Sequence, residues 1–290
     1  MKSLVFPIVL LAVVAGIVVA TVARNSGRAT GSPAPDSILW EEAVGPYLSA
    51  TPELLSRGEE IYRDRCDMCH GPRGEGNGPG AYFLDTKPRN FASRTFKFRT
   101  TADGMPADQD LFRSVTVGFE AYGMPPFRAL SIRDRWAVVY YVKSLAEAGT
   151  RRTLERVAKK MGEKFDPREV TRLMQSGAVF ELPPETAPQE GDGVLGRALF
   201  EKHCVVCHGE QGRGDGRAAT KDMKDAWGRM IQPRDLRAGR RYRKTGWRTR
   251  DIARVIVLGI GGTPMPKTAL NDASELWALA RYVRSLSGER

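Results

Sequence analysis

The chain has 290 residues, which suggests two domains of ordinary size or one large domain. Hydrophobic residues make up 41% of the chain, which is enough to build a folded core. Its formal net charge of +11 comes from 45 basic and 34 acidic residues. Such an excess favours acidic partners, anionic lipid headgroups or nucleic acid, and does not choose among them.

The first predicted element is an uncharged apolar run, Leu4–Val22. A membrane-spanning helix needs about 17–25 residues, whereas the apolar part of a signal peptide has about 7–15. The run has spanning length, so we predict an uncleaved membrane anchor over residues 1–24. The alternative is a signal peptide removed after Ala20 or Ala23. Both interpretations export the rest of the chain, beginning with a flexible stalk over residues 25–51.

The remainder of the chain repeats itself. The same motifs occur in the same order in both halves: RGEEIYRDRCDMCHGPRGEGNGPG matches LGRALFEKHCVVCHGEQGRGDGRA, KPRNF matches QPRDL, DLFRSVTVGFEAYGMPPF matches DIARVIVLGIGGTPMPKT, and DRWAVVYYVKSL matches ELWALARYVRSL. An ordered internal repeat of this kind indicates a duplicated structural unit. We therefore predict two copies of one domain, over residues 52–147 and 191–288.

Helix signals open and close the first copy. Thr51 and Pro52 supply an N-cap and a first-turn proline, which predicts a helix running past Tyr62. Ser131 and Asp134 have capping-box spacing and begin a last helix with apolar residues on one face. The middle of each copy is rich in glycine and proline and shows no sustained strand alternation. We therefore predict a mostly α fold of two small, loop-rich helical domains.

Residues 148–190 connect the two copies. Asp166 and Pro167 predict the start of a short helix that Gly177 can end. The following PPETAPQEGDG is typical of a plain linker.

Each copy carries a Cys-x-x-Cys-His motif, CDMCH at 66–70 and CVVCH at 204–208, which is the signature of covalent c-type haem attachment. Both thiols must reach the vinyl groups on one porphyrin edge, and the next residue must turn its imidazole onto the iron. A redox dithiol or half of a zinc site would also use a cysteine pair. A zinc site needs further ligands, and each copy has too few histidines and no second cysteine pair. We therefore predict two covalent haem c groups, held by Cys66, Cys69, His70, Cys204, Cys207 and His208.

The chain has only three histidines, so bis-histidine ligation of both haems is excluded. Met124 and Met265 lie in proline-flanked loops before the last helix of each copy, and we predict them as the second axial iron ligands. Met105 is a rival in the first copy, but its counterpart in the second falls near Trp247, so the repeat does not support it. The alternative is that a methionine beside proline only fills a gap in the core.

Each half resembles a class I cytochrome c domain. The resemblance rests on CDMCH, GMPPF and KPRNF in the first copy and on CVVCH, TPMPK and QPRDL in the second, and it covers everything except the anchor, stalk and connector. It implies histidine on one face of the iron and methionine on the other. It also implies a crossing of the first and last helices of each copy, here Gly58 and Tyr62 with Trp136 and Tyr141, and Gly196 and Phe200 with Trp277 and Tyr282.

The resemblance further implies that a proline carbonyl, at Pro88 and Pro233, accepts a hydrogen bond from the iron-binding imidazole and fixes its orientation. Simple loop prolines are the alternative. Four arginines could pair with haem propionates, although most arginines in so basic a chain are solvated: Arg89, Arg99, Arg234 and Arg243.

Two six-coordinate haems leave no iron position for a substrate, so we predict an electron-transfer protein rather than an enzyme, with no catalytic residue. It would lie on the periplasmic side of a bacterial cytoplasmic membrane, meet redox partners that are acidic at the docking face, and not bind nucleic acid. The layout resembles the dihaem subunits of cbb3-type oxidases and the cytochrome subunits of alcohol dehydrogenases. The alternative is a dihaem peroxidase, which needs one haem with a displaceable or absent distal ligand.

Overall fold

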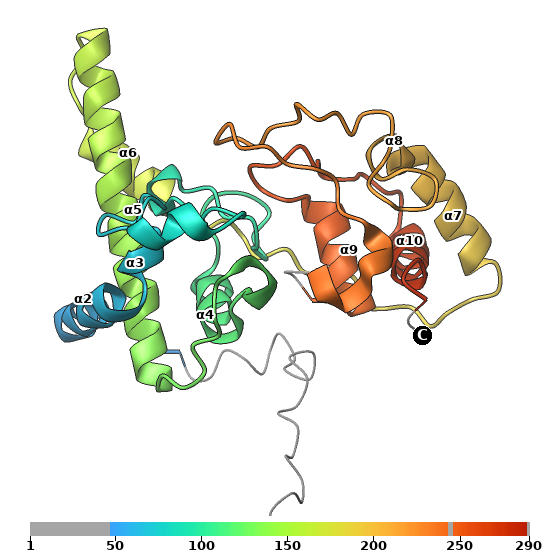
Figure 1. The fold of residues 1–290 in the computed structure, drawn as a ribbon, viewed down its shortest axis with the longest axis horizontal. Helices are drawn as coiled ribbons and strands as arrows, with labels where there is room; N and C mark the ends of the chain where they lie inside the picture. The colour runs from blue at the N-terminus through green and yellow to red at the C-terminus, as the bar shows by residue number, and fades with distance from the viewer. Residues whose placement is uncertain (1–46, 243–245, 289–290) are drawn as a thin grey trace, which may run out of the picture. The chain divides into compact units, whose positions relative to one another are not determined.

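A computed structural model describes residues 47–242 and 246–288 (Figure 1). The predicted anchor lies outside these residues. Within them the chain forms helices and isolated β-bridges but no strand, which confirms the mostly α prediction. None of the helices in this part of the chain is long and apolar enough to span a membrane. The α-helices are α2 (Pro52–Arg65), α3 (Asp67–His70), α4 (Asp108–Val117), α5 (Ile132–Met161), α6 (Pro167–Met174), α7 (Asp192–His203), α8 (Val205–His208), α9 (Thr249–Leu258) and α10 (Ala273–Ser285). Short 3-10 turns are η2 (Pro79–Phe83), η3 (Phe91–Ser93), η4 (Glu120–Tyr122) and η5 (Leu236–Tyr242).

The predicted caps begin the first and last helices of the first copy. The Leu54 amide donates to Thr51 Oγ1 at 3.2 Å, and Pro52 occupies the first turn of α2. The Asp134 amide donates to Ser131 Oγ at 3.0 Å at the start of α5. Each hydroxyl satisfies a backbone N–H that has no partner inside its helix. Both helix starts are therefore set by local sequence.

The first and last helices of each copy cross at a glycine, as predicted. In the first copy, α2 packs on α5, and a Cβ atom at Gly58 would overlap the Ala137 carbonyl. In the second copy, α7 packs on α10, and a Cβ atom at Gly196 would overlap the Ala278 carbonyl. Only a residue without a side chain allows such an approach of two helix backbones. The crossing places the haem-attachment motif, which follows the first helix, beside the last helix.

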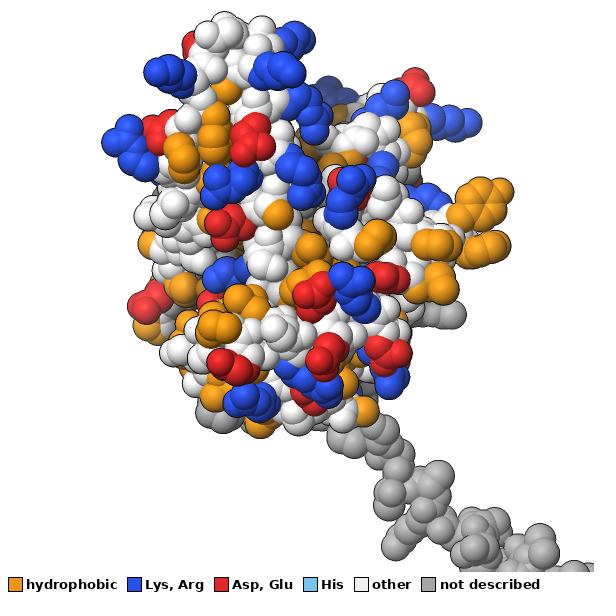
Figure 2. Space-filling model, turned by 90° about the vertical axis from the view of Figure 1, so that its left-hand side faces the viewer, with side chains coloured by type: hydrophobic (Ala, Val, Ile, Leu, Met, Phe, Trp, Pro, Cys, Tyr) orange, Lys and Arg blue, Asp and Glu red, His pale blue; other side chains and the backbone are white. Residues whose placement is uncertain are grey.

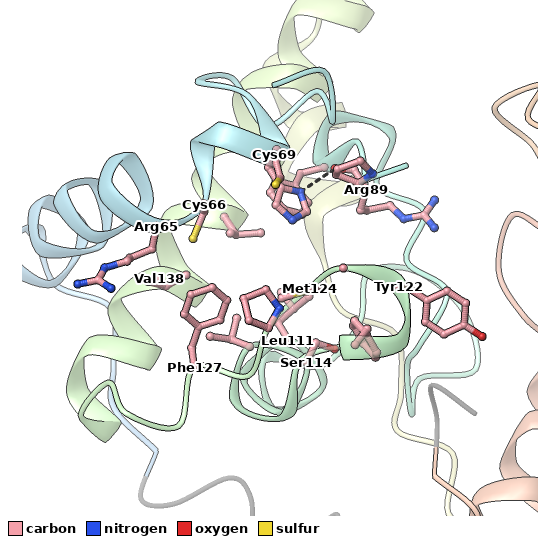
Figure 3. A pocket seen from close by; sticks show the side chains of 18 of the residues that line it. Arg65, Cys66, Cys69, Arg89, Leu111, Ser114, Tyr122, Met124, Phe127 and Val138 are labelled. Carbon is pink, nitrogen blue, oxygen red and sulfur yellow. Dashed lines mark hydrogen bonds between the residues drawn. The ribbon is translucent and has the colours of Figure 1, made fainter. Parts of the chain in front are cut away.

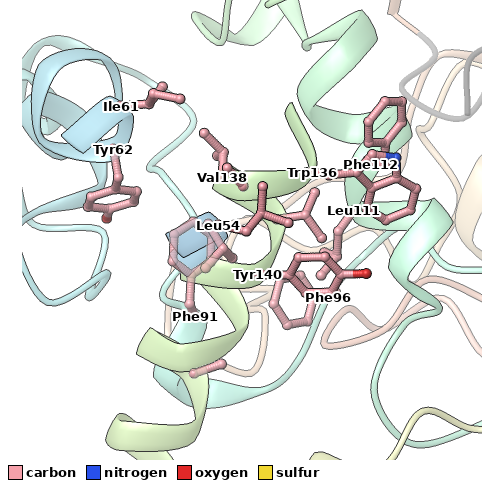
Figure 4. Close-up of a cluster of buried hydrophobic side chains, with 14 of the residues drawn as sticks. Leu54, Ile61, Tyr62, Phe91, Phe96, Leu111, Phe112, Trp136, Val138 and Tyr140 are labelled. Atoms are coloured by element: carbon pink, nitrogen blue, oxygen red, sulfur yellow. The ribbon is translucent and has the colours of Figure 1, made fainter. Parts of the chain in front are cut away.

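Each copy has its own hydrophobic core. In the first copy the crossing buries Tyr62 and Trp136 completely, with Phe112 of α4 against the indole ring at 4.5 Å between ring centroids (Figure 4). In the second copy Phe200 and Trp277 occupy the matching places and are buried to the same degree. Burial of large aromatic side chains is a main source of stability in a small domain.

The connector is more ordered than the sequence indicates. Helix α5 runs without a break past residue 147 to Met161, and its C-terminal half extends beyond the first copy (Figure 1). Helix α6 starts at the predicted Asp166 cap but ends at Met174, before Gly177. Residues 176–180 then return to the first copy, where the Phe180 amide donates to the Thr100 carbonyl at 2.7 Å.

The predicted plain linker is also fixed to the protein. The Trp277 indole N–H donates to the Pro184 carbonyl at 2.8 Å, and Arg281 donates to the Thr186 carbonyl at 3.0 Å. The linker therefore lies along α10. Proline removes backbone donors but leaves carbonyls that side chains of another element can bind, and composition alone does not reveal such partners.

Candidate functional site

The two cysteines and the histidine of each motif share one short helical turn. In the first copy α2 ends at Arg65, Cys66 follows, and α3 carries Cys69 and His70. The His70 amide donates to the Cys66 carbonyl at 2.9 Å, and the His208 amide donates to the Cys204 carbonyl at 2.8 Å. The same local geometry thus recurs in both copies. None of the four cysteines is in a disulfide.

Each histidine is oriented by a backbone carbonyl on the proline loop. The imidazole Nδ1 of His70 lies 3.2 Å from the Arg89 carbonyl oxygen, and that of His208 lies 3.2 Å from the Arg234 carbonyl oxygen (Figure 3 shows the first). Since a carbonyl can only accept, Nδ1 must carry the proton, and the lone pair that an iron ligand needs is on Nε2.

The carbonyl is not the one that the cytochrome resemblance implies. It belongs to the residue after Pro88, and in the second copy to the residue after Pro233. The prolines shape this loop but are not the acceptors. The Pro88 carbonyl instead faces the glycine-rich loop that follows His70. A Cβ atom at Gly76 of that loop would lie 2.5 Å from the Pro88 carbonyl oxygen. With φ of +74°, Gly76 also has a conformation that favours glycine.

A large cavity opens between the first motif and the loop before α5. It contains about 1340 Å³ of empty space, part of it open to solvent, and Cys66, Cys69 and His70 line one side. Figure 3 shows Met124 across the cavity from the two cysteines. The remaining walls are mainly apolar and include Leu111, Phe127, Val138 and Val142. Mainly apolar walls with two thiols beside an imidazole suit a large, flat, apolar cofactor such as haem.

The two candidate methionines of the first copy lie in different environments. Met124 lines the cavity, whereas Met105 does not and is buried in the core at 1% exposure. The Met105 amide donates to the Gln175 carbonyl at 3.2 Å, so its loop is occupied by the connector. This arrangement favours Met124 over Met105 as a ligand.

The methionine loops of the two copies share one backbone hydrogen bond. The Phe119 amide donates to the Met124 carbonyl at 2.7 Å, and in the second copy the Ile260 amide donates to the Met265 carbonyl at 3.2 Å. The Met124 amide also donates to the Phe119 carbonyl at 3.3 Å, whereas the Met265 amide donates to Thr263 Oγ1 at 3.2 Å. The repeat therefore extends to the closing bond of each loop but not to the partner of the methionine amide.

Burial suits the motif side chains to cofactor attachment rather than to thiolate chemistry. Burial raises the pKa of Cys66 to about 12, with nearby Asp67 as a smaller cause. Burial also raises the pKa of Cys204 to about 11, with Cys207 as a smaller cause. A redox-active or metal-bound cysteine needs a lowered pKa instead. Burial also lowers the pKa of His70, which keeps the imidazole neutral, as an iron ligand must be.

One aromatic contact at the site was not anticipated. Phe91 stacks on the His70 ring, with 4.7 Å between ring centroids and 18° between planes. Phe91 follows Arg89 closely in the KPRNF motif, so the motif supplies both the carbonyl that orients the histidine and the ring that packs on it. The repeated motif was the available signal, but QPRDL has leucine at this place.

The predicted propionate partners differ in their surroundings. Arg89 lines the cavity, and its buried Nη1 atom has no hydrogen-bond partner. Burial lowers the pKa of its guanidinium to about 10, which still leaves it charged at neutral pH. A propionate would satisfy this atom, so Arg89 fits a haem in the cavity. Arg99 instead donates to the Gly104 carbonyl at 2.9 Å, and Arg243 lies outside the described residues.

Comparisons with known proteins match each copy to a cytochrome family. Residues 53–142 match the family model described as cytochrome C oxidase, cbb3-type, subunit III, and residues 194–287 match the model described as cytochrome c. Among solved structures, the chain is similar to one from the Kuenenia stuttgartiensis reducing HAO-like protein complex Kustc0457/Kustc0458. The two are 30% identical with a TM-score of 0.68, over 82% of this chain and 99% of that one. No curated protein matches the chain.

Proposed function

Because this chain belongs to the cytochrome c family and contains two cytochrome c domains, we propose that it is a dihaem electron-transfer protein. The observation that carries this proposal is the presence, in both copies, of an attachment turn whose histidine has Nδ1 held by a backbone carbonyl. That arrangement presents Nε2 to a metal in each copy. One haem per copy follows, two in all.

The residues of each copy have separate roles at the site. The two cysteines would hold the haem through thioether bonds, and His70 and His208 would each bind the iron of their own copy. Met124 and Met265 would be the further iron ligands. Bound haem supplies reversible one-electron oxidation and reduction of its iron. The apolar walls, among them Leu111 and Val138, exclude water from the site.

Two protein ligands at each iron would favour electron transfer over turnover of a substrate. Methionine as an iron ligand raises the reduction potential of the haem, which suits a carrier that accepts an electron and passes it on. A peroxidase would instead need one iron with an open or displaceable position. Peroxide turnover by the purified, reduced protein would therefore contradict the proposal.

The chain works with redox partner proteins, as a free carrier or as a subunit of a larger complex. The similar Kuenenia chain comes from a protein complex, and the first-copy family model is named for an oxidase subunit. The excess of basic residues favours a partner that is acidic at its docking face. Figure 2 shows basic side chains gathered at the end of the molecule to which the C-terminal half of α5 extends. Exposed basic residues there are Arg151, Arg152, Arg156, Lys159 and Lys160.

We place the haem domains on the periplasmic side of a bacterial cytoplasmic membrane, held by a single-pass anchor at Leu4–Val22. The length of this apolar run supports the proposal. The protein should remain with the membrane fraction after a salt wash, and external protease should reach both domains. A soluble form that begins near Thr21 or Arg24 would show that the segment is a cleaved signal peptide.

Mass spectrometry tests the haem count. The mature protein should carry two covalent haem groups. Replacing Cys66 and Cys69 together with alanine should remove one haem, and the same change at Cys204 and Cys207 should remove the other. A protein that binds zinc and no haem would end the proposal.

A further inference from the structure

The second copy contacts the first at the loop that orients His70. The guanidinium carbon of Arg89 lies 3.8 Å from the centre of the Trp227 ring, well within cation–π range. The backbone carbonyl of the same arginine accepts the hydrogen bond from His70. Arg89 thus makes two contacts. Its backbone carbonyl binds His70 of the same copy, and its side chain packs on Trp227 of the second copy.

The equivalent arginine of the second copy makes the reciprocal contact. Arg234 takes the place of Arg89 in the repeat, and its carbonyl accepts the hydrogen bond from His208. Its guanidinium carbon lies 4.7 Å from the centre of the Tyr122 ring in the first copy. Repetition of the contact at matching positions argues that it is a built feature of the pair rather than an incidental one.

Each aromatic ring is attached to the methionine loop of its own copy. Tyr122 precedes Met124 by two positions. Trp227 packs on Gly262, three positions before Met265, and a Cβ atom at Gly262 would overlap the indole. The Ala226 amide also donates to the Gly262 carbonyl at 2.9 Å. Each arginine therefore joins the histidine loop of one site to the methionine loop of the other.

Further contacts hold the same two loops together. Arg229 Nη1 donates to the Lys87 and Pro88 carbonyls, both at 3.3 Å. Lys97 and Asp225 form an ion pair at 3.7 Å, with side chains only 14% and 6% exposed. Removing one partner of such a desolvated pair leaves an uncompensated charge, so the pair favours a single arrangement of the loops.

The packing is continuous from His70 to the second copy. Phe91 lies between His70 and Phe96, with 6.2 Å between the Phe91 and Phe96 ring centroids and 9° between their planes. The Phe96 carbonyl oxygen in turn lies against Gly261, where a Cβ atom would come within 2.8 Å.

We propose that the Arg89–Trp227 and Arg234–Tyr122 contacts are positioning contacts that lock the two copies together, so that each haem site is held partly by the other copy. This inference rests on the proposed electron-transfer function. Its consequence is direct exchange within one chain: the ferrous site loses one electron, the ferric site gains it, and no other reactant takes part. Trp227 and Tyr122 act through the methionine loops of their own copies.

Hydrogen exchange on the haem-loaded full chain tests the contact without depending on electron transfer. Trp227 lies in the second copy, yet Trp227→Ala should speed amide exchange in residues 87–97 of the first copy about tenfold. This factor corresponds to a loss of ~1.4 kcal/mol in the free energy of local opening. Trp227→Phe keeps a ring and should change the exchange little. Met230→Ala is the matched control, because Met230 lies on the same loop but is 57% exposed. Unchanged exchange in residues 87–97 of Trp227→Ala would overturn the proposal.

A second measurement follows the electron itself. After a reducing pulse of less than one electron per protein, the rate at which the electron redistributes between the haems should be independent of protein concentration. Loss of one cation–π contact should make this rate about tenfold slower in Trp227→Ala. Redistribution that depends on concentration would also overturn the inference. Where Trp227→Ala fails to fold, Arg234→Gln provides the reciprocal test, with exchange read at residues 119–124. Absence of haem from the wild type would instead refute the proposed function.

Discussion

The helix crossing of the second copy provides a matched pair of glycines for a stability test. Gly193 and Gly196 both lie in α7. A Cβ atom at Gly196 would overlap the Ala278 carbonyl oxygen and lie 2.7 Å from Tyr282 Cβ, whereas a Cβ atom at Gly193 would have no neighbour within 4 Å. Alanine at Gly196 therefore introduces a backbone clash that alanine at Gly193 does not.

The expected difference follows from two opposing effects. Alanine stabilises a helix interior by about 1 kcal/mol relative to glycine, and by less near a helix end. Overfilling a packed contact costs about 1–3 kcal/mol, and here the obstacle is a carbonyl group that cannot rotate away as a side chain can. Gly193 lies in the first turn of α7 and gains less from alanine than Gly196 does, so this gain offsets part of the clash. We therefore expect Gly196→Ala to be about 1–2 kcal/mol less stable than Gly193→Ala.

Guanidinium unfolding of the haem-loaded protein, followed by far-ultraviolet circular dichroism, measures this difference as a shift in midpoint. Only the transition of the second copy should move, and Gly58→Ala should move that of the first copy in the same direction. Equal or greater stability of Gly196→Ala would refute the close crossing. A uniform shift of both transitions would show that the copies unfold as one unit.

Three further predictions concern the first copy. Met124→His should lower the potential of one haem and remove its far-red sulfur-to-iron absorption, while Met105→Leu should leave both haems nearly unchanged, because only Met124 lines the cavity; loss of the band in Met105→Leu alone would reverse the assignment. Ser131→Ala removes the cap of α5 and should cost about 1 kcal/mol in chemical unfolding, whereas Ser131→Asp should retain most of the stability. The Arg57 hydrogen bond lowers the pKa of Asp134 in the folded protein below its ordinary 3.8. The pair therefore stabilises the protein fully above pH 3.8, and this stabilisation is lost as the pH falls through the pKa of Asp134 in the folded protein. Arg57→Gln should therefore be slightly less stable than wild type at neutral pH and equal to it in acid, and a pH-independent difference would contradict this reasoning.

The motifs, the duplication and the helix starts could be predicted because each depends on residues close together in the chain. Ser131 caps α5 through an amide three residues away, and Cys66 and His70 lie on one helical turn. Glycine at Gly58 and Gly196 was assigned to a helix crossing through the cytochrome resemblance, and the packing agrees. The cap and the attachment turn survive any arrangement of the rest of the molecule, since their partners lie within a few residues. The glycine crossings have partners far away in the chain, and only the resemblance made them predictable.

Other features were decided only by tertiary structure, because their partners are distant in sequence and any of several residues could have filled each place. The acceptor for His70 is the carbonyl of Arg89 rather than that of Pro88, a shift of one residue that depends on how two loops meet. The linker looks free in sequence, yet Pro184 accepts a hydrogen bond from Trp277. Whether Arg89 is solvated or contacts Trp227 likewise depends on the packing of one copy against the other. Local sequence determines which groups each copy presents, and long-range packing selects the partner that each group finds.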